Sequence, residues 1–118
     1  MKLTSTLKIS TYGCKVVLII TDSLINEANK VYKKHKMGQM FEGDAEGTVI
    51  TPDIDVYYMI IEQKYLSHNT LSHENYHIVN VIKSDRGIVD DEAGAWLSGH
   101  IAEFIYKFID KKQLIVKH

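Results

Sequence analysis

Residues 54–86 read IDVYYMIIEQKYLSHNTLSHENYHIVNVIKSDR, and this stretch decides the fold because it joins a strand to a long helix. Its first part, up to Glu62, is rich in aromatic and β-branched side chains, which favours a β-strand. A helix is expected from Ser67 or Asn69 to about Asp85, because capping residues precede a long apolar pattern there. Only a short connection separates the two elements.

The N-terminal half predicts the other strands and a first helix. Alternating and β-branched runs on either side of Tyr12-Gly13 are typical of a hairpin. The expected elements are hairpin strands Leu7–Thr11 and Lys15–Thr21, a helix from Asp22 or Ser23 to about Lys36, a loop from Gly38 to Gly47, and a strand Thr48–Thr51 before a turn at Pro52-Asp53.

A last helix is predicted from Asp90 or Asp91, after a stop at Gly87. Its apolar stripe consists of Ala93, Leu97, Ile101, Phe104 and Phe108. The element order is therefore ββαββαα. This order indicates an α+β fold in which a small twisted sheet, antiparallel or mixed, packs on helices. No repeat or linker divides the chain, so residues 1–118 are expected to form one domain.

Composition excludes several classes of function. The 118 residues are 45% hydrophobic and 25% charged with a net charge of −1, and no basic face for nucleic acid is evident. The single cysteine, Cys14, excludes an internal disulfide and a cysteine-based zinc cluster. The apolar run Val16–Ile20 is too short to span a membrane and lacks the features of a signal peptide. A cytoplasmic protein is expected, with a phage-associated one as an alternative.

The pentapeptide His73-Glu74-Asn75-Tyr76-His77 carries the chemistry. Residues four apart lie on the same face of a helix, so His73 and His77 can direct their imidazole nitrogens at one zinc ion. Glu74 then sits beside the metal without having to bind it. From there it can take a proton from a water molecule on the metal, which makes it the predicted catalytic base.

The alternative interpretation is that the two histidines are ordinary polar residues on a solvated helix face. The flanking apolar residues argue against it, because they predict a helix that is apolar over most of its circumference: Leu71, Ile78, Val79, Val81 and Ile82. Histidines on such a buried helix need polar or metal partners.

Glu92, fifteen residues after His77, is the preferred third zinc ligand. Small residues after it allow the last helix to approach the histidine helix closely: Gly94, Ala95, Ser98 and Gly99. Asp91 and Asp90 are the competing ligands, although Asp90 suits a helix cap better. All three could also act simply as charges that favour the start of a helix.

These residues carry a family resemblance. His73-Glu74-x-x-His77 followed by Glu92-x-x-Ala95-Trp96 resembles the gluzincin pattern, in which a glutamate from a downstream helix completes a zinc site. The entry Thr70-Leu71-Ser72 and the continuation to Gly99 are similar to short phage and mobile-element metallopeptidases. The resemblance covers about residues 54 to 108, and the N-terminal half matches only as a β-rich lead-in.

The resemblance implies a minimal zincin-like domain with a sheet edge that binds an extended peptide. It also implies a zinc-dependent hydrolase that cleaves peptide bonds with Glu74 as general base. Larger family members place a Tyr, His or Arg at the substrate oxyanion, and the candidates here are Tyr76, His100, Tyr106 and His68. The alternative function is a zincin-like binding or regulatory module that holds a partner protein without turnover, such as a phage accessory protein or a toxin–antitoxin-like partner.

Overall fold

A computed structural model describes all residues 1–118 and contains one four-stranded mixed sheet. The strands are β1 (Lys2–Ile9), β2 (Cys14–Thr21), β3 (Gly47–Asp53) and β4 (Val56–Glu62), in the spatial order β1-β2-β4-β3. β1 pairs antiparallel with β2, β2 runs parallel to β4, and β3 pairs antiparallel with β4. β1 and β3 are therefore the two edges of the sheet.

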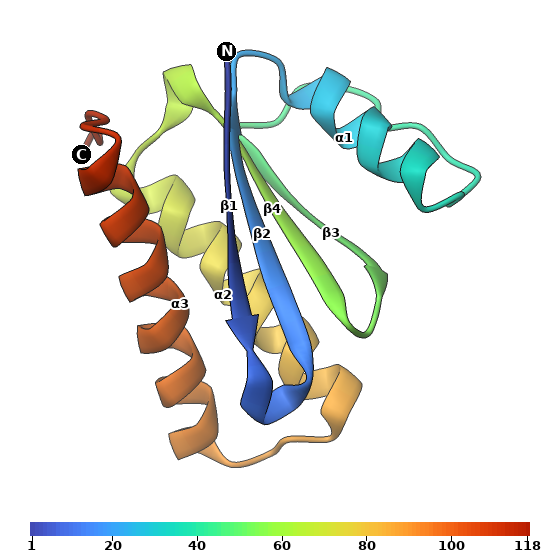
Figure 1. Ribbon diagram of the computed structural model, residues 1–118, viewed down its shortest axis with the longest axis vertical. Helices are drawn as coiled ribbons and strands as arrows, with labels where there is room; N and C mark the ends of the chain where they lie inside the picture. The colour runs from blue at the N-terminus through green and yellow to red at the C-terminus, as the bar shows by residue number, and fades with distance from the viewer.

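Three helices cover the sheet on both faces (Figure 1). They are α1 (Leu24–Lys34), α2 (His68–Arg86) and α3 (Asp91–Lys111). α2 and α3 lie together on one face, whereas α1 lies on the other. The expected α+β class and the order ββαββαα are thus confirmed. None of the helices is both long enough and apolar enough to cross a membrane.

Two hydrophobic cores follow from the alternation of side chains along the strands. The larger core joins the sheet to α2 and α3, and its sheet residues include Leu18, Tyr57 and Met59. The smaller core joins the sheet to α1 and includes Ile19 and Ile60. Because β2 and β4 carry apolar residues on both faces, they occupy the centre of the sheet.

Local sequence signals explain most helix ends. Ser23 caps α1 by accepting a hydrogen bond from the Asn26 backbone N–H, and Ser67 caps α2 in the same way through Thr70 N–H. Gly87 ends α2 in the left-handed conformation, with φ of 63°. The sequence predicted each of these boundaries to within two residues of the observed end.

The predicted turn at Pro52-Asp53 is wrong. β3 continues through Pro52 to Asp53, and the turn falls one step later, before Val56. Proline is tolerated there because β3 is an edge strand, and the pairing register with β4 shifts between Ile50 and Asp53. The predicted first strand, Leu7–Thr11, is wrong at both ends, because β1 begins at Lys2 and ends at Ile9, and a short 3-10 helix follows over Ser10–Tyr12.

The expectation that α2 is buried on most of its circumference is also wrong. Leu71, Ile78 and Ile82 point into the larger core, whereas Ser72, His73, Tyr76, His77 and Asn80 are exposed. The helix lies flat on the sheet with α3 along one flank, which leaves its outer face open to solvent.

Candidate metal centre

The orientation of α2 determines where its polar residues lie. At 100° per residue, Leu71, Ile78 and Ile82 form the stripe that contacts the sheet. His73 and His77 lie together at the outer edge of this helix, on the flank that faces β3. The apolar stripe therefore anchors α2 on the sheet. The histidines lie away from this stripe, so their side chains stay exposed to solvent.

The two imidazoles converge on one point. His73 Nε2 and His77 Nε2 are 3.2 Å apart, and the ring planes meet at 79°. Two nitrogens bound to the same tetrahedral zinc ion, each at about 2.0–2.1 Å, lie roughly 3.3 Å apart. The separation of the two nitrogens is therefore close to that of two ligands on one zinc ion, and it is also that of a hydrogen bond between the two rings.

Glu74 lies between this pair and the sheet. Its side chain is 8% exposed, and its Oε2 atom lies 3.9 Å from His73 Nε2. Burial raises the pKa of the Glu74 carboxyl, and the neighbouring His73 and His77 oppose this rise. A carboxylate with a raised pKa is a better proton acceptor, so the location suits a general base.

Close contact with β3 holds Glu74 in place. A Cβ atom added at Gly47, the first residue of β3, would lie 3.0 Å from Glu74 Cγ and 2.8 Å from Ile61 Cδ1. A larger residue at position 47 would require the side chains of Ile61 and Glu74 to shift. Gly47 therefore acts as a positioning residue for Glu74.

A polar depression of about 230 Å³ opens above this contact. We call it the α2–β3 depression, and it is lined by Glu46, Gly47, Asn69, Thr70, His73 and Glu74. The Thr70 hydroxyl donates a hydrogen bond to Glu46 Oε2 at 3.0 Å, and Ser67 Oγ donates to Thr70 Oγ1, also at 3.0 Å. The depression thus contains two carboxylates and one imidazole of the histidine pair.

Glu92 lies elsewhere. α3 packs on the flank of α2 that carries Asn75, whose side-chain amide donates to the Ser98 carbonyl. On the helix that flank is roughly 160° away from both histidines. A Cβ atom at Gly94 would meet Lys83 Nζ at 3.0 Å, so the first turn of α3 lies beside the end of α2. The structure therefore brings His73, His77 and Glu74 together but does not bring Glu92 to them.

The competing carboxylates are in the same first turn. Asp90 caps α3 by accepting from the Glu92 backbone N–H, and Asp91 is exposed. No group of three or more His, Cys, Asp or Glu side chains is arranged to hold a metal ion. A zinc ion at the histidine pair would need a further ligand from a side chain that moves toward it.

The residues considered for an oxyanion role are scattered. Tyr76 is 64% exposed beside His77. His68 Nδ1 is 2.7 Å from the Tyr106 hydroxyl, between α2 and α3. His100 stacks on Trp96 on the side of α3 that faces β1. Of these, only Tyr76 lies beside the histidine pair.

The chain matches no model of a protein family, no curated protein and no solved structure.

Sequence patterns did not identify Glu46, Gly47 or Thr70 as members of the site. Glu46 and Gly47 lie at the end of a polar loop, and glycine is common in such loops for reasons unrelated to a functional site. One signal could have been noticed: Thr70 lies one turn before Glu74 on the same side of the helix.

Proposed function

We propose that this protein is a zinc-dependent hydrolase that cleaves peptide bonds, with a minimal zincin-like arrangement of helix and edge strand. The observation that carries the proposal is the 3.2 Å separation of His73 Nε2 and His77 Nε2 beside a buried glutamate. An extended peptide would lie along the edge of β3, where Gly47 brings backbone groups close to Glu74.

Glu74 performs the proton transfers in this proposal. When bound, zinc supplies a Lewis acid that polarises a carbonyl and lowers the pKa of water. Glu74 accepts a proton from the attacking water while a C–O bond forms at the peptide carbon. It then gives that proton to the departing amine nitrogen as the C–N bond breaks, which leaves one carboxylic acid, carrying the second proton of the water, and one amine.

Two carboxylates compete for the third ligand position. Glu92 is the sequence-based choice, and its use requires a rearrangement of the first turn of α3. Glu46 lines the same depression as His73, and its carboxylate accepts a hydrogen bond from Thr70. Its place in that depression favours Glu46. We therefore expect E46Q to weaken zinc binding at least tenfold, and E92Q to leave the affinity within about twofold.

Glu74→Gln tests the proposed chemistry. The amide keeps the size of the side chain but cannot accept the proton from water, so the variant should bind zinc with unchanged stoichiometry and lose hydrolysis of a quenched-fluorescent peptide library. Full hydrolysis by E74Q would contradict the role of Glu74. Zinc binding without any hydrolysis by the wild type would exclude the peptidase function and leave the metal site intact.

A second candidate function is a zincin-like binding module without turnover. The absence of a third ligand at the histidine pair favours it. In that case peptides would bind to the β3 edge, with or without zinc, and no cleavage products would accumulate. Mass spectrometry of the library after long incubation separates the two candidates.

A further inference from the structure

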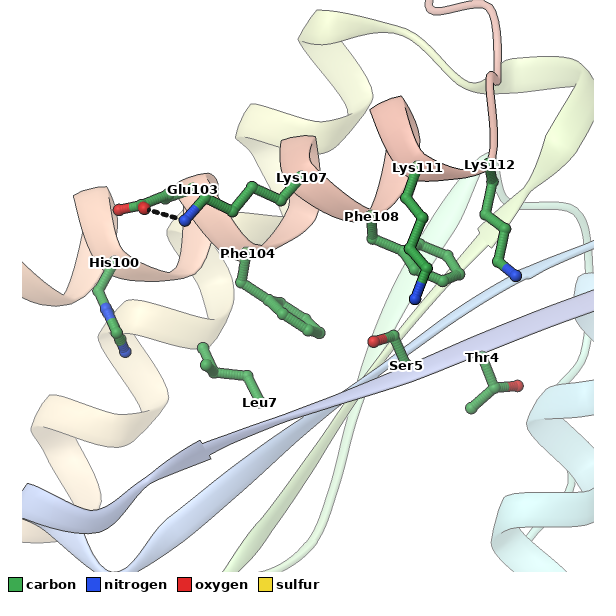
Figure 2. Close-up of a pocket in the computed structure, with 10 residues that line it drawn as sticks. All are labelled: Thr4, Ser5, Leu7, His100, Glu103, Phe104, Lys107, Phe108, Lys111 and Lys112. Atoms are coloured by element: carbon green, nitrogen blue, oxygen red, sulfur yellow. Dashed lines mark ion pairs between the residues drawn. The ribbon is translucent and has the colours of Figure 1, made fainter.

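The opposite edge of the sheet carries a second groove, which the proposed function does not use. We call it the β1–α3 groove; it has a volume of about 440 Å³ between β1 and α3. Leu7 lines it from the strand, while Phe104 and Phe108 point into it from the helix (Figure 2). Its floor is therefore apolar.

Along this groove, backbone N–H and C=O groups of β1 are free to pair with another strand. β1 is an edge strand of eight residues that pairs only with β2. In an antiparallel pair, about half of the N–H and C=O groups of an edge strand point away from its partner. A strand that entered the groove would satisfy these groups and place every second side chain against α3.

The charge of the groove selects the chemistry of the occupant. Its lining contains three lysines and one glutamate, although the whole chain has a net charge of −1. Lys107 is held by Glu103 at 2.6 Å on the outer side of the helix. Lys111 and Lys112 have no ion-pair partner and extend toward β1 near Thr4 and Ser5.

A second copy of this chain fits the groove poorly. Residues 2–8, KLTSTLK, are palindromic, so antiparallel pairing of two β1 strands centred on Ser5 would place Lys2 opposite Lys8 twice. Like charges directly opposite each other destabilise strand pairs, although Glu27 offsets part of the charge of Lys2. Such pairing would also bring two lysine-lined grooves together.

We propose that the β1–α3 groove binds an extended acidic peptide segment of a partner protein as a fifth strand of the sheet. Alternate side chains of the segment enter the groove. An acidic side chain pairs with Lys111 or Lys112, and an apolar one contacts Phe104, Phe108 and Leu7.

The probe for the test is the blocked peptide acetyl-Thr-Glu-Thr-Val-Thr-Glu-Thr-amide, which presents the same side chains in either strand direction. Titration into ¹⁵N-labelled protein should shift the amides of β1 and the facing side of α3. The affinity should fall as salt screens the charges. The same peptide with Lys in place of Glu, and one N-methylated at alternate residues, should each bind at least tenfold more weakly.

The matched variants are K111E/K112E and K33E/K34E. Both reverse two exposed lysines in or next to the last turn of a helix, but Lys33 and Lys34 lie on α1 at the other face of the sheet. K111E/K112E should weaken binding at least tenfold, whereas K33E/K34E should change it by less than twofold. Equal loss in both pairs would reduce the effect to net charge and overturn the proposal.

Three other outcomes would also overturn it. These are equal affinity for the lysine or the N-methylated peptide, shifts confined to the β3 edge, and a dimer of the protein alone that protects the β1 amides in hydrogen exchange. The last outcome would identify a second copy as the occupant.

Discussion

The two edges of the sheet present opposite chemistry although each is flanked by a helix on the same face. At the β3 edge, the α2–β3 depression is polar throughout and contains Glu46, Glu74 and His73. At the β1 edge, the β1–α3 groove is larger and combines a phenylalanine floor with lysines. The two edges of one small sheet therefore differ in size, in polarity and in the sign of the charges that line them.

The edges also differ in how they resist unwanted pairing. β3 carries Pro52 and a register shift, both of which interrupt the row of backbone groups that another strand could use. β1 has neither, and only its lysines discourage association with a second β1. The β1 edge is thus the better surface for a complete added strand, and β3 is better suited to a short contact beside the histidine pair.

Gly47→Ala should have the largest effect, and only at the β3 edge. The added methyl group meets Ile61 Cδ1 at 2.8 Å and Glu74 Cγ at 3.0 Å, so we expect a loss of about 1–3 kcal/mol in the free energy of unfolding. Urea denaturation measures it. Gly99→Ala is the control, because no atom lies within 4 Å of its added Cβ, and it should stabilise α3 by about 0.5–1 kcal/mol. Equal effects in both variants would show that Glu74 does not pack against Gly47.

Glu27→Gln should lower the free energy of unfolding by removing an ion pair between β1 and α1. The buried Glu27 carboxylate accepts from Lys2 Nζ at 2.9 Å and Lys30 Nζ at 3.2 Å. Burial alone would raise its pKa, but these hydrogen bonds and charges outweigh burial and lower the pKa below 4.5. The stabilisation is therefore present above pH 4.5 and is lost as the pH falls through the folded-state pKa.

We expect this variant to lose about 1–2 kcal/mol at pH 7 and to approach the wild type as the pH falls through the folded-state pKa of Glu27. Lys34→Gln, which changes an exposed lysine of the same helix outside any ion pair, is the control. A constant difference between E27Q and the wild type from pH 3 to pH 7 would contradict the assignment.

Tyr57→Phe should lower the free energy of unfolding by a smaller amount. It changes a contact between β4 and α2, which lies between the two edges rather than at one of them. The Tyr57 hydroxyl donates to Asp85 Oδ2 at 2.6 Å and accepts from Arg86 Nη1 at 2.7 Å, which ties β4 to the end of α2. Burial and the hydrogen bond to Asp85 raise the pKa of Tyr57 to about 12. The stabilisation should be about 1 kcal/mol below pH 10 and should disappear as the pH rises toward 12.

Urea denaturation of the wild type and Y57F at pH 8 and pH 11 checks this. The difference in the free energy of unfolding between the wild type and Y57F should be smaller at pH 11 than at pH 8. A gap that widens would mean that the hydroxyl is not the titrating group.

The sequence predicted the helices and strands better than it predicted which of them lie next to each other. Caps such as Ser67 and Gly87 are local, and so is the four-residue spacing that brings His73 to His77. The parallel pairing of β2 with β4 is not local, and neither is the choice of flank on which α3 packs. The flank on which α3 packs separates Glu92 from the histidines, and the packing of α2 beside β3 brings Glu46 to Thr70. No spacing within the helices could reveal either contact.

The exposure of the histidine pair is the other lesson. Apolar residues around His73 and His77 predicted a buried helix, yet they occupy one face and leave the other open. Burial therefore does not force these histidines to find a partner. The case for a metal rests on the convergence of the two nitrogens.

The most direct test of the account is the zinc stoichiometry of protein purified without chelator, measured by competition with a chromophoric chelator. We expect about one zinc ion per wild-type chain and none in H77A, because a single imidazole cannot replace the pair. Circular dichroism should show that the variant remains folded, since His77 is exposed. Full zinc content in a His73→Ala/His77→Ala double variant would contradict the assignment of this metal centre.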